Sequence, residues 1–242
     1  MKREYHRTPS RHVGRDMEML VFGHAGARVL MFPPRMGRFF DYENWGMVER
    51  LRGSIEQGWI QLYCLDSLDA ESLYDWGRRP SERIARHQQF ERYVLDEVEP
   101  FTRLENSDPS LIAFGCSLGA YHAVNLAFRH PRRFAKVVAF SGRFDLTRGI
   151  AHYPDLFDGF YDDTVYFHTP SHFLANLQDP GELEALRRLE IALVVGRDDP
   201  VISNNRGLSE TLFSKGIGHR FHEWDGEAHR PSAWRAMVPH FL

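Results

Sequence analysis

The feature that most constrains the fold is the five-residue turn Gly115-Cys116-Ser117-Leu118-Gly119. Residues 110–114 before it form a compact apolar run typical of a buried strand, and residues 118–128 after it have a helical pattern. A serine at such a strand-to-helix turn is held in strained backbone geometry, and side chains two residues to either side would collide, which requires glycine there. The pattern predicts a nucleophilic serine, Ser117, whose Oγ stands above the end of a sheet.

Short β-branched or aromatic runs alternate with helical patterns along the rest of the chain. Strands are expected at residues 17–22, 28–32, 59–65, 110–114, 136–140, 191–195 and 220–224. This alternation predicts an α/β fold, with a mostly parallel sheet covered by helices on both faces. The first two strands, joined by a turn at residues 24–27, predict an N-terminal antiparallel hairpin.

One such sheet, its helices and one insertion use up nearly all 242 residues, so a single α/β domain over residues 1–242 is expected. Residues 143–182 lack clear periodicity, and we expect them to form a small cap insertion between two late strands. Aromatic residues are frequent there: Phe144, Tyr153, Phe157, Phe160, Tyr161, Tyr166, Phe167 and Phe173. They either line an apolar pocket or pin the insertion onto the body, and the sequence leaves both interpretations open.

A nucleophilic serine needs a base, and the base needs a carboxylate that orients it. On a sheet of this kind the order along the chain is serine, acid, histidine, and the acid follows a late strand. The strand at residues 191–195 is followed by Gly196-Arg197-Asp198-Asp199. Asp199 is the expected acid, and Asp198 is the alternative.

The base should lie in a loop after the last strand, and His229 stands in such a loop at residues 226–231. Other histidines lie too early in the chain or in the closing helix: His122, His168, His172, His219, His222 and His240. The oxyanion of an acyl-transfer intermediate needs two backbone N–H donors. Leu118 is one candidate, and the loop at residues 33–38 offers Met36, with Gly37 as its alternative.

Composition excludes several other classes of protein. Lys plus Arg total 30 and Asp plus Glu total 33, a near balance that argues against a dedicated nucleic-acid binder. The apolar runs fall far short of a membrane span, and the charged start lacks a signal-peptide pattern, so we expect a cytoplasmic protein without a membrane partner. Neither cysteine has metal-ligand neighbours, and His219 with His222 lacks a second pair, so no metal is expected. Monomer and homodimer both fit the sequence.

These motifs resemble the α/β-hydrolase superfamily, and within it the Putative esterase family of S-formylglutathione hydrolases, feruloyl esterases and mycolyltransferases. The resemblance rests on GCSLGAYHA and VVGRDDPV, each after a strand, and on GEAH before the last helix. The sequence PPRMGRFFDYEN stands where lipase-type relatives have a His-Gly dipeptide. The resemblance implies a Ser-His-Asp serine esterase that needs no cofactor and acts on a small-molecule ester. An acyltransferase with the same triad, or a non-catalytic binding protein on this fold, is the alternative.

Overall fold

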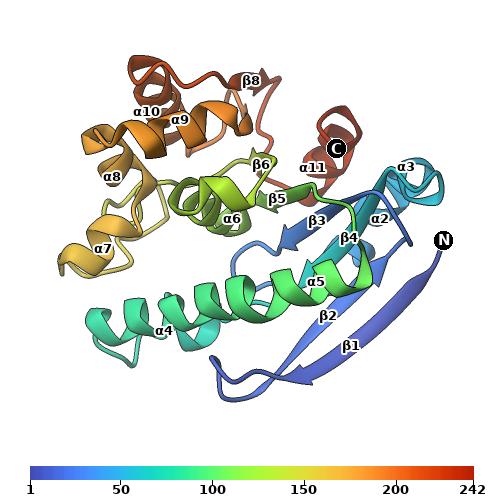
Figure 1. Cartoon of the computed structure of the whole chain (residues 1–242). Helices are drawn as coiled ribbons and strands as arrows, with labels where there is room; N and C mark the ends of the chain where they lie inside the picture. The colour runs from blue at the N-terminus through green and yellow to red at the C-terminus, as the bar shows by residue number, and fades with distance from the viewer.

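The computed structural model describes all 242 residues and contains one eight-stranded sheet with the order β1-β2-β4-β3-β5-β6-β7-β8 (Figure 1). The strands are β1 (Arg3–Pro9), β2 (Asp16–Phe22), β3 (Ala27–Phe32), β4 (Ile60–Leu65), β5 (Leu111–Cys116), β6 (Lys136–Phe140), β7 (Glu190–Gly196) and β8 (Arg220–Trp224). The six strands from β4 to β8 in this order are parallel, and β1 and β2 are antiparallel. The expected α/β architecture is confirmed.

The antiparallel hairpin is present, but it is made by other strands than the sequence predicts. β2 pairs with β1, from Arg3 opposite Phe22 to Pro9 opposite Asp16, and its other edge pairs with β4. β3, the expected partner of β2, lies between β4 and β5 and is parallel to both. The pairing of residues 17–22 with 28–32 is therefore wrong. Because every residue of β4 is buried, this strand takes an interior place between β2 and β3.

Helices cover both faces of the sheet, as expected (Figure 1). Their bounds are α1 (Asp41–Asn44), α2 (Met47–Arg50), α3 (Arg52–Glu56), α4 (Pro80–Tyr93), α5 (Glu99–Glu105), α6 (Leu118–Arg129), α7 (Asp163–Phe167), α8 (Pro170–Asn176), α9 (Pro180–Arg188), α10 (Ile202–Ser214) and α11 (Pro231–Met237). A π-helical turn, η2 (Val94–Val98), joins α4 to α5. Apolar residues of α4, α6, α8 and α10 form one core, and those of α2, α3 and α11 form the other.

Alternate residues of the central strands enter the two cores. In β3, Leu30 and Phe32 belong to the core under α4 and α6, whereas Val29 and Met31 belong to the core under α2 and α11. This is the two-residue period of a strand that is buried on both sides. The central strands are thereby fixed in register, and the loops at their C-terminal ends stand on a rigid base.

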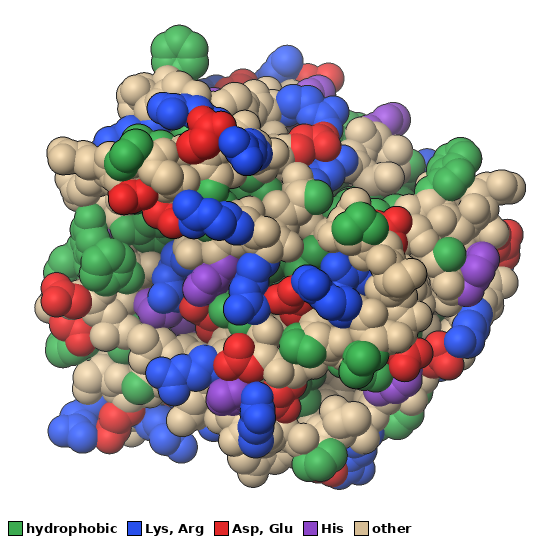
Figure 2. All heavy atoms as spheres, viewed as in Figure 1, with side chains coloured by type: hydrophobic (Ala, Val, Ile, Leu, Met, Phe, Trp, Pro, Cys, Tyr) green, Lys and Arg blue, Asp and Glu red, His purple; other side chains and the backbone are tan.

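Charged side chains are mixed over the surface. On the face in Figure 2, acidic and basic residues are interspersed and form no large patch of one sign, which agrees with the net charge of -3. None of the helices has the length and apolar character that are needed to cross a bilayer. Residues 143–182 leave the sheet after β6 and carry α7 and α8, which lie beside each other at one end of the molecule (Figure 1).

Candidate active site

Ser117 stands at the turn between β5 and α6, where its backbone has φ 55° and ψ -119°. This region of backbone space is unfavourable for a residue with a side chain. The Ser117 N–H donates to the carbonyl of Phe140 on β6 at 2.8 Å, which ties the turn to the neighbouring strand. The strained serine that the sequence predicts at this position is present.

Two glycines allow this turn to form. A Cβ at Gly115 would lie 2.1 Å from the carbonyl oxygen of Gly119, and a Cβ at Gly119 would lie 2.1 Å from that of Phe32. Each position therefore excludes a side chain because backbone atoms occupy the space. The expected need for glycine at both positions is confirmed, and α6 packs close to the end of β3 as a result.

His229 lies in the loop between β8 and α11, and it contacts both other residues of the predicted group. Its Nε2 is 2.8 Å from Ser117 Oγ, and its Nδ1 is 3.1 Å from Asp199 Oδ1. The ring of Trp234 on α11 packs edge-on against the imidazole, with centroids 5.5 Å apart. The three side chains thus form one continuous chain of hydrogen bonds, from the end of β5 to the ends of β7 and β8.

Asp199 is fully buried, and its Oδ1 also accepts the N–H of Val201 at 3.0 Å. Burial alone would raise the pKa of this carboxyl, but the hydrogen bond from His229, the charge of that ring and the Val201 N–H hold the pKa below its ordinary value. Asp198, the alternative acid, is exposed and bonds through its N–H to the carbonyl of Gly226. The geometry favours Asp199 as the partner of His229.

The N–H of Leu118 lies in the first turn of α6, where N–H groups lack an acceptor within the helix. Met36, the second expected donor, does not fit the structure, because its N–H already donates to Asp69 Oδ2 at 2.9 Å. Gly37 is equally occupied, since its N–H bonds the carbonyl of Pro34 at 2.8 Å. Neither Met36 nor Gly37 therefore has a free N–H for the oxyanion, and the prediction of a donor at these two positions needs correction.

Arg35 is the residue of this loop that could donate instead. Pro33 and Pro34 carry no N–H, and the N–H of Arg38 bonds Asp41 Oδ2 at 2.9 Å. The N–H of Arg35 has no acceptor in the protein, and Arg35 lines the same cavity as Ser117. Sequence reasoning missed this residue because backbone direction in a loop leaves no mark on residue type.

The cavity around Ser117 has a volume of about 20 Å³. Its lining residues are Arg35, Tyr74, Ser117, Leu118, Arg143, Leu146, Tyr153, Val201 and His229. The Tyr153 hydroxyl is 3.2 Å from His229 Nε2, the atom that also faces Ser117. Such a volume holds little more than one water molecule. In this conformation the Tyr153 hydroxyl takes up part of the space beside His229 Nε2.

The aromatic residues of 143–182 have both of the roles that the sequence allows: one lines the cavity, and others pin the insertion onto the body of the protein. Tyr153 lines the site, whereas Phe144 and Phe157 are fully buried in the two neighbouring apolar clusters. Tyr74, in the loop after β4, also lines the cavity. Trp76, two residues further on, is half exposed and packs against Arg83.

Cys116, next to the serine, is fully buried, and burial raises the pKa of its thiol well above the ordinary value. A thiol held neutral and out of solvent is a poor nucleophile. We therefore expect iodoacetamide to leave the esterase activity of the native protein unchanged and both cysteines unmodified, as mass spectrometry would show. Rapid alkylation of Cys116 with loss of activity would contradict this assignment.

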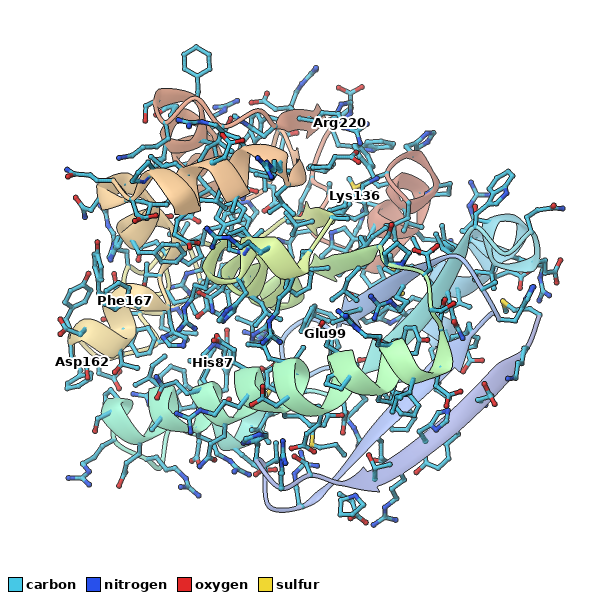
Figure 3. All side chains as sticks on the ribbon, in the orientation of Figure 1. His87, Glu99, Lys136, Asp162, Phe167 and Arg220 are labelled. Carbon is cyan, nitrogen blue, oxygen red and sulfur yellow. The ribbon has the colours of Figure 1, made fainter.

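A second polar cluster lies between α4, α6 and the link from α7 to α8, away from the serine. Ligand atoms of His87, Glu91 and His168 lie within 4.8 Å of one another, a spacing that would suit a metal ion. In Figure 3, His87 lies on the side of α4 that faces the body of the protein. Arg129 Nη1, however, is 2.7 Å from His168 Nε2 and also bonds Glu91. The guanidinium already supplies the positive charge, so this cluster does not fit a metal ion.

A strained serine after a central strand, a histidine after the last strand and a mostly parallel sheet define the α/β-hydrolase fold. The sequence model of the Putative esterase family matches residues 43–241. The chain belongs to this family, and it is a carboxylic ester hydrolase. No curated protein matches the sequence.

Solved structures of esterases share this fold over nearly their whole length. A ferulic acid esterase superposes with a TM-score of 0.77 at 14% identity, covering 100% of this chain and 96% of its own. An S-formylglutathione hydrolase from Agrobacterium tumefaciens superposes with a TM-score of 0.77 at 15% identity, covering 98% and 92%. The fluorophosphonate-binding serine hydrolase F of Staphylococcus aureus superposes with a TM-score of 0.69 at 14% identity, covering 99% and 96%.

Proposed function

We propose that the protein hydrolyses carboxylic esters through Ser117 as nucleophile, His229 as general base and acid, and Asp199 as the residue that orients His229. The observation that carries this proposal is the unbroken hydrogen-bond chain from Asp199 Oδ1 through the imidazole to Ser117 Oγ. A buried carboxylate on Nδ1 fixes the tautomer that leaves Nε2 free to accept the serine proton. The serine then has a base at hydrogen-bond distance in the resting protein.

In the first half of the reaction, Ser117 Oγ attacks the ester carbonyl carbon while its proton passes to His229 Nε2. The carbonyl oxygen becomes an oxyanion, which the N–H groups of Leu118 and Arg35 stabilise. Arg35 takes the place of Met36 in this assignment, because the Met36 N–H is held by Asp69. His229 then gives the proton to the leaving alcohol as the carbon–oxygen bond breaks, and the acyl group stays on Ser117.

In the second half, His229 takes a proton from water, and the resulting hydroxide attacks the acyl carbon. The tetrahedral intermediate collapses, Ser117 recovers its proton from His229, and the carboxylic acid leaves. An acyltransferase would use the same residues with an alcohol in place of water. Residues 143–182 serve in this proposal as a cap on a single α/β domain, since Arg143, Leu146 and Tyr153 from this segment line the cavity.

The two neighbouring aspartates offer a matched test of this proposal. We expect Asp199→Asn to lower kcat for p-nitrophenyl acetate by roughly 10⁴-fold, because an amide at this place stabilises the wrong tautomer of His229. Asp198→Asn removes an exposed carboxylate from the adjacent position and should change kcat less than about twofold. The measurement is p-nitrophenol release under saturating substrate. Loss of activity in Asp198→Asn with retention in Asp199→Asn would reverse the assignment.

A further inference from the structure

We propose that the site selects esters that carry a carboxylate, and that the guanidinium groups of Arg143 and Arg35 bind this carboxylate beside the ester. This inference rests on the proposed function, because both arginines line the cavity that contains Ser117 and His229. It names the substrate class: an anionic ester, with the charge on either the acyl or the alcohol part.

Arg143 follows β6 and is only 6% exposed. Its Nε donates to the carbonyl of Asp145 at 3.1 Å, and its Nη2 donates to those of Arg148 at 2.6 Å, Pro154 at 2.7 Å and Leu146 at 3.3 Å. These bonds hold the start of the insertion in place. All of these acceptors are neutral, so the buried positive charge has no carboxylate among its hydrogen-bond partners.

The third nitrogen of this guanidinium is free. Nη1 of Arg143 is buried and has no hydrogen-bond partner, which leaves two N–H donors unused. Burial lowers the pKa of Arg143, and the charges of Asp145 and Asp155 nearby offset only part of this effect. Among the other buried arginines, Arg28 has acceptors for all three nitrogens, whereas Arg83 leaves Nε and Nη1 unpaired. What sets Arg143 apart from Arg83 is its place, because Arg143 lines the cavity that contains Ser117 and His229.

The charge of the cavity supports the same conclusion. Its lining includes Arg35 and Arg143 and no aspartate or glutamate, although the whole chain carries a net charge of -3. The exposed Arg35 lies on the oxyanion loop, with its guanidinium 5.7 Å from the ring centroid of Tyr74. A guanidinium binds a carboxylate through two parallel hydrogen bonds, which are stronger than bonds between neutral groups. Nε and Nη2 of Arg143 are bonded to carbonyls, so Arg143 offers a carboxylate one nitrogen, Nη1, and the proposed two-bond contact comes from the exposed guanidinium of Arg35.

The first test compares matched esters on the wild-type protein. For the acyl side, the pair is the mono-p-nitrophenyl ester of glutaric acid and p-nitrophenyl valerate. For the alcohol side, the pair is acetoxybenzoate and phenyl acetate, each rate being corrected for its uncatalysed hydrolysis. We expect kcat/KM to favour the anionic member of one pair by at least about tenfold, which corresponds to about 1.4 kcal/mol. Equal or lower rates for the anionic member of both pairs would overturn the inference.

The second test uses variants of the two arginines. We expect Arg143→Lys and Arg143→Met to reduce the preference about tenfold, mainly by raising KM for the anionic ester, because a charge-assisted hydrogen bond is lost. Arg35→Gln changes an exposed side chain and should reduce the same ratio even if the Arg143 variants fail to fold. Arg148→Gln is the matched control, since this exposed side chain does not line the cavity, and its ratio should stay that of the wild type.

Two results separate this inference from the proposed function. If the arginine variants lower kcat/KM for both members of a pair equally, Arg143 has a structural role alone and the inference fails. If the wild type hydrolyses neutral esters in a Ser117-dependent way without any anionic preference, the proposed function stands while the inference fails. Activity that survives Ser117→Ala would instead contradict the proposed function itself.

Discussion

Ser117→Ala is expected to lower kcat for p-nitrophenyl acetate by roughly 10⁴- to 10⁶-fold, the range found when a single residue of a catalytic triad is removed. The methyl group of alanine can neither attack the ester nor receive the acyl group, and His229 loses the hydroxyl that lies 2.8 Å from its Nε2. Binding and the oxyanion donors would remain, so a small residual rate above that of water is expected. Initial rates of p-nitrophenol release would measure the effect.

The control for this substitution is Ser214→Ala, which changes an exposed serine at the end of α10. We expect it to keep the wild-type rate. A fluorophosphonate should label the wild type at Ser117 and leave Ser117→Ala unlabelled, as peptide mass spectrometry would show. Labelling of another residue, or full activity without Ser117, would refute the proposed nucleophile.

Addition of an alcohol acceptor to the same assay separates hydrolysis from acyl transfer, because a transferase would form the new ester faster than the acid.

Gly119→Ala should lower the free energy of unfolding by at least about 3 kcal/mol, a large effect for one methyl group. The new Cβ would lie 2.1 Å from the Phe32 carbonyl oxygen and 2.6 Å from that of Pro33. Both are backbone atoms at the end of a central strand, so relief requires α6 to move away from β3. Urea unfolding followed by circular dichroism would measure the loss.

The matched control is Gly207→Ala in α10, where an added Cβ has no neighbour within 4 Å. Alanine restricts the unfolded chain more than glycine does, so this variant should gain about 0.5–1 kcal/mol. Equal unfolding midpoints for Gly119→Ala and the wild type would show that the strand and helix can separate at little cost.

The parts of the site that follow from local chemistry could be predicted from the sequence. Ser117 stands out because only a serine between two glycines, after a strand and before a helix, fits the turn. Asp199 and His229 follow from chain order, since the loops after successive parallel strands meet at one edge of the sheet. The structure brings these three side chains together, with the bonds on both nitrogens of the ring.

The features of the fold and the site that depend on residues far apart in the sequence could not be predicted. Strand β1 carries mostly exposed residues, so it lacks the apolar pattern that reveals a buried strand. The error at Met36 arose because its acceptor, Asp69, lies 33 positions further along the chain. Arg143 sits in the segment without periodicity, and its free nitrogen follows from four carbonyl contacts that no local pattern encodes.

The hydroxyl of Tyr153 contacts His229 Nε2, the atom that also faces Ser117, so an ester bound for attack competes with this contact. Since a cavity of about 20 Å³ leaves room for little more than one water molecule, the proposed hydrolysis requires a fraction of molecules in which Tyr153 has moved aside. The apparent dissociation constant is then the intrinsic one divided by that fraction. Changes at Tyr153 that alter the equilibrium alone would scale the affinity of all esters by one common factor, and the ratio between two esters would not change.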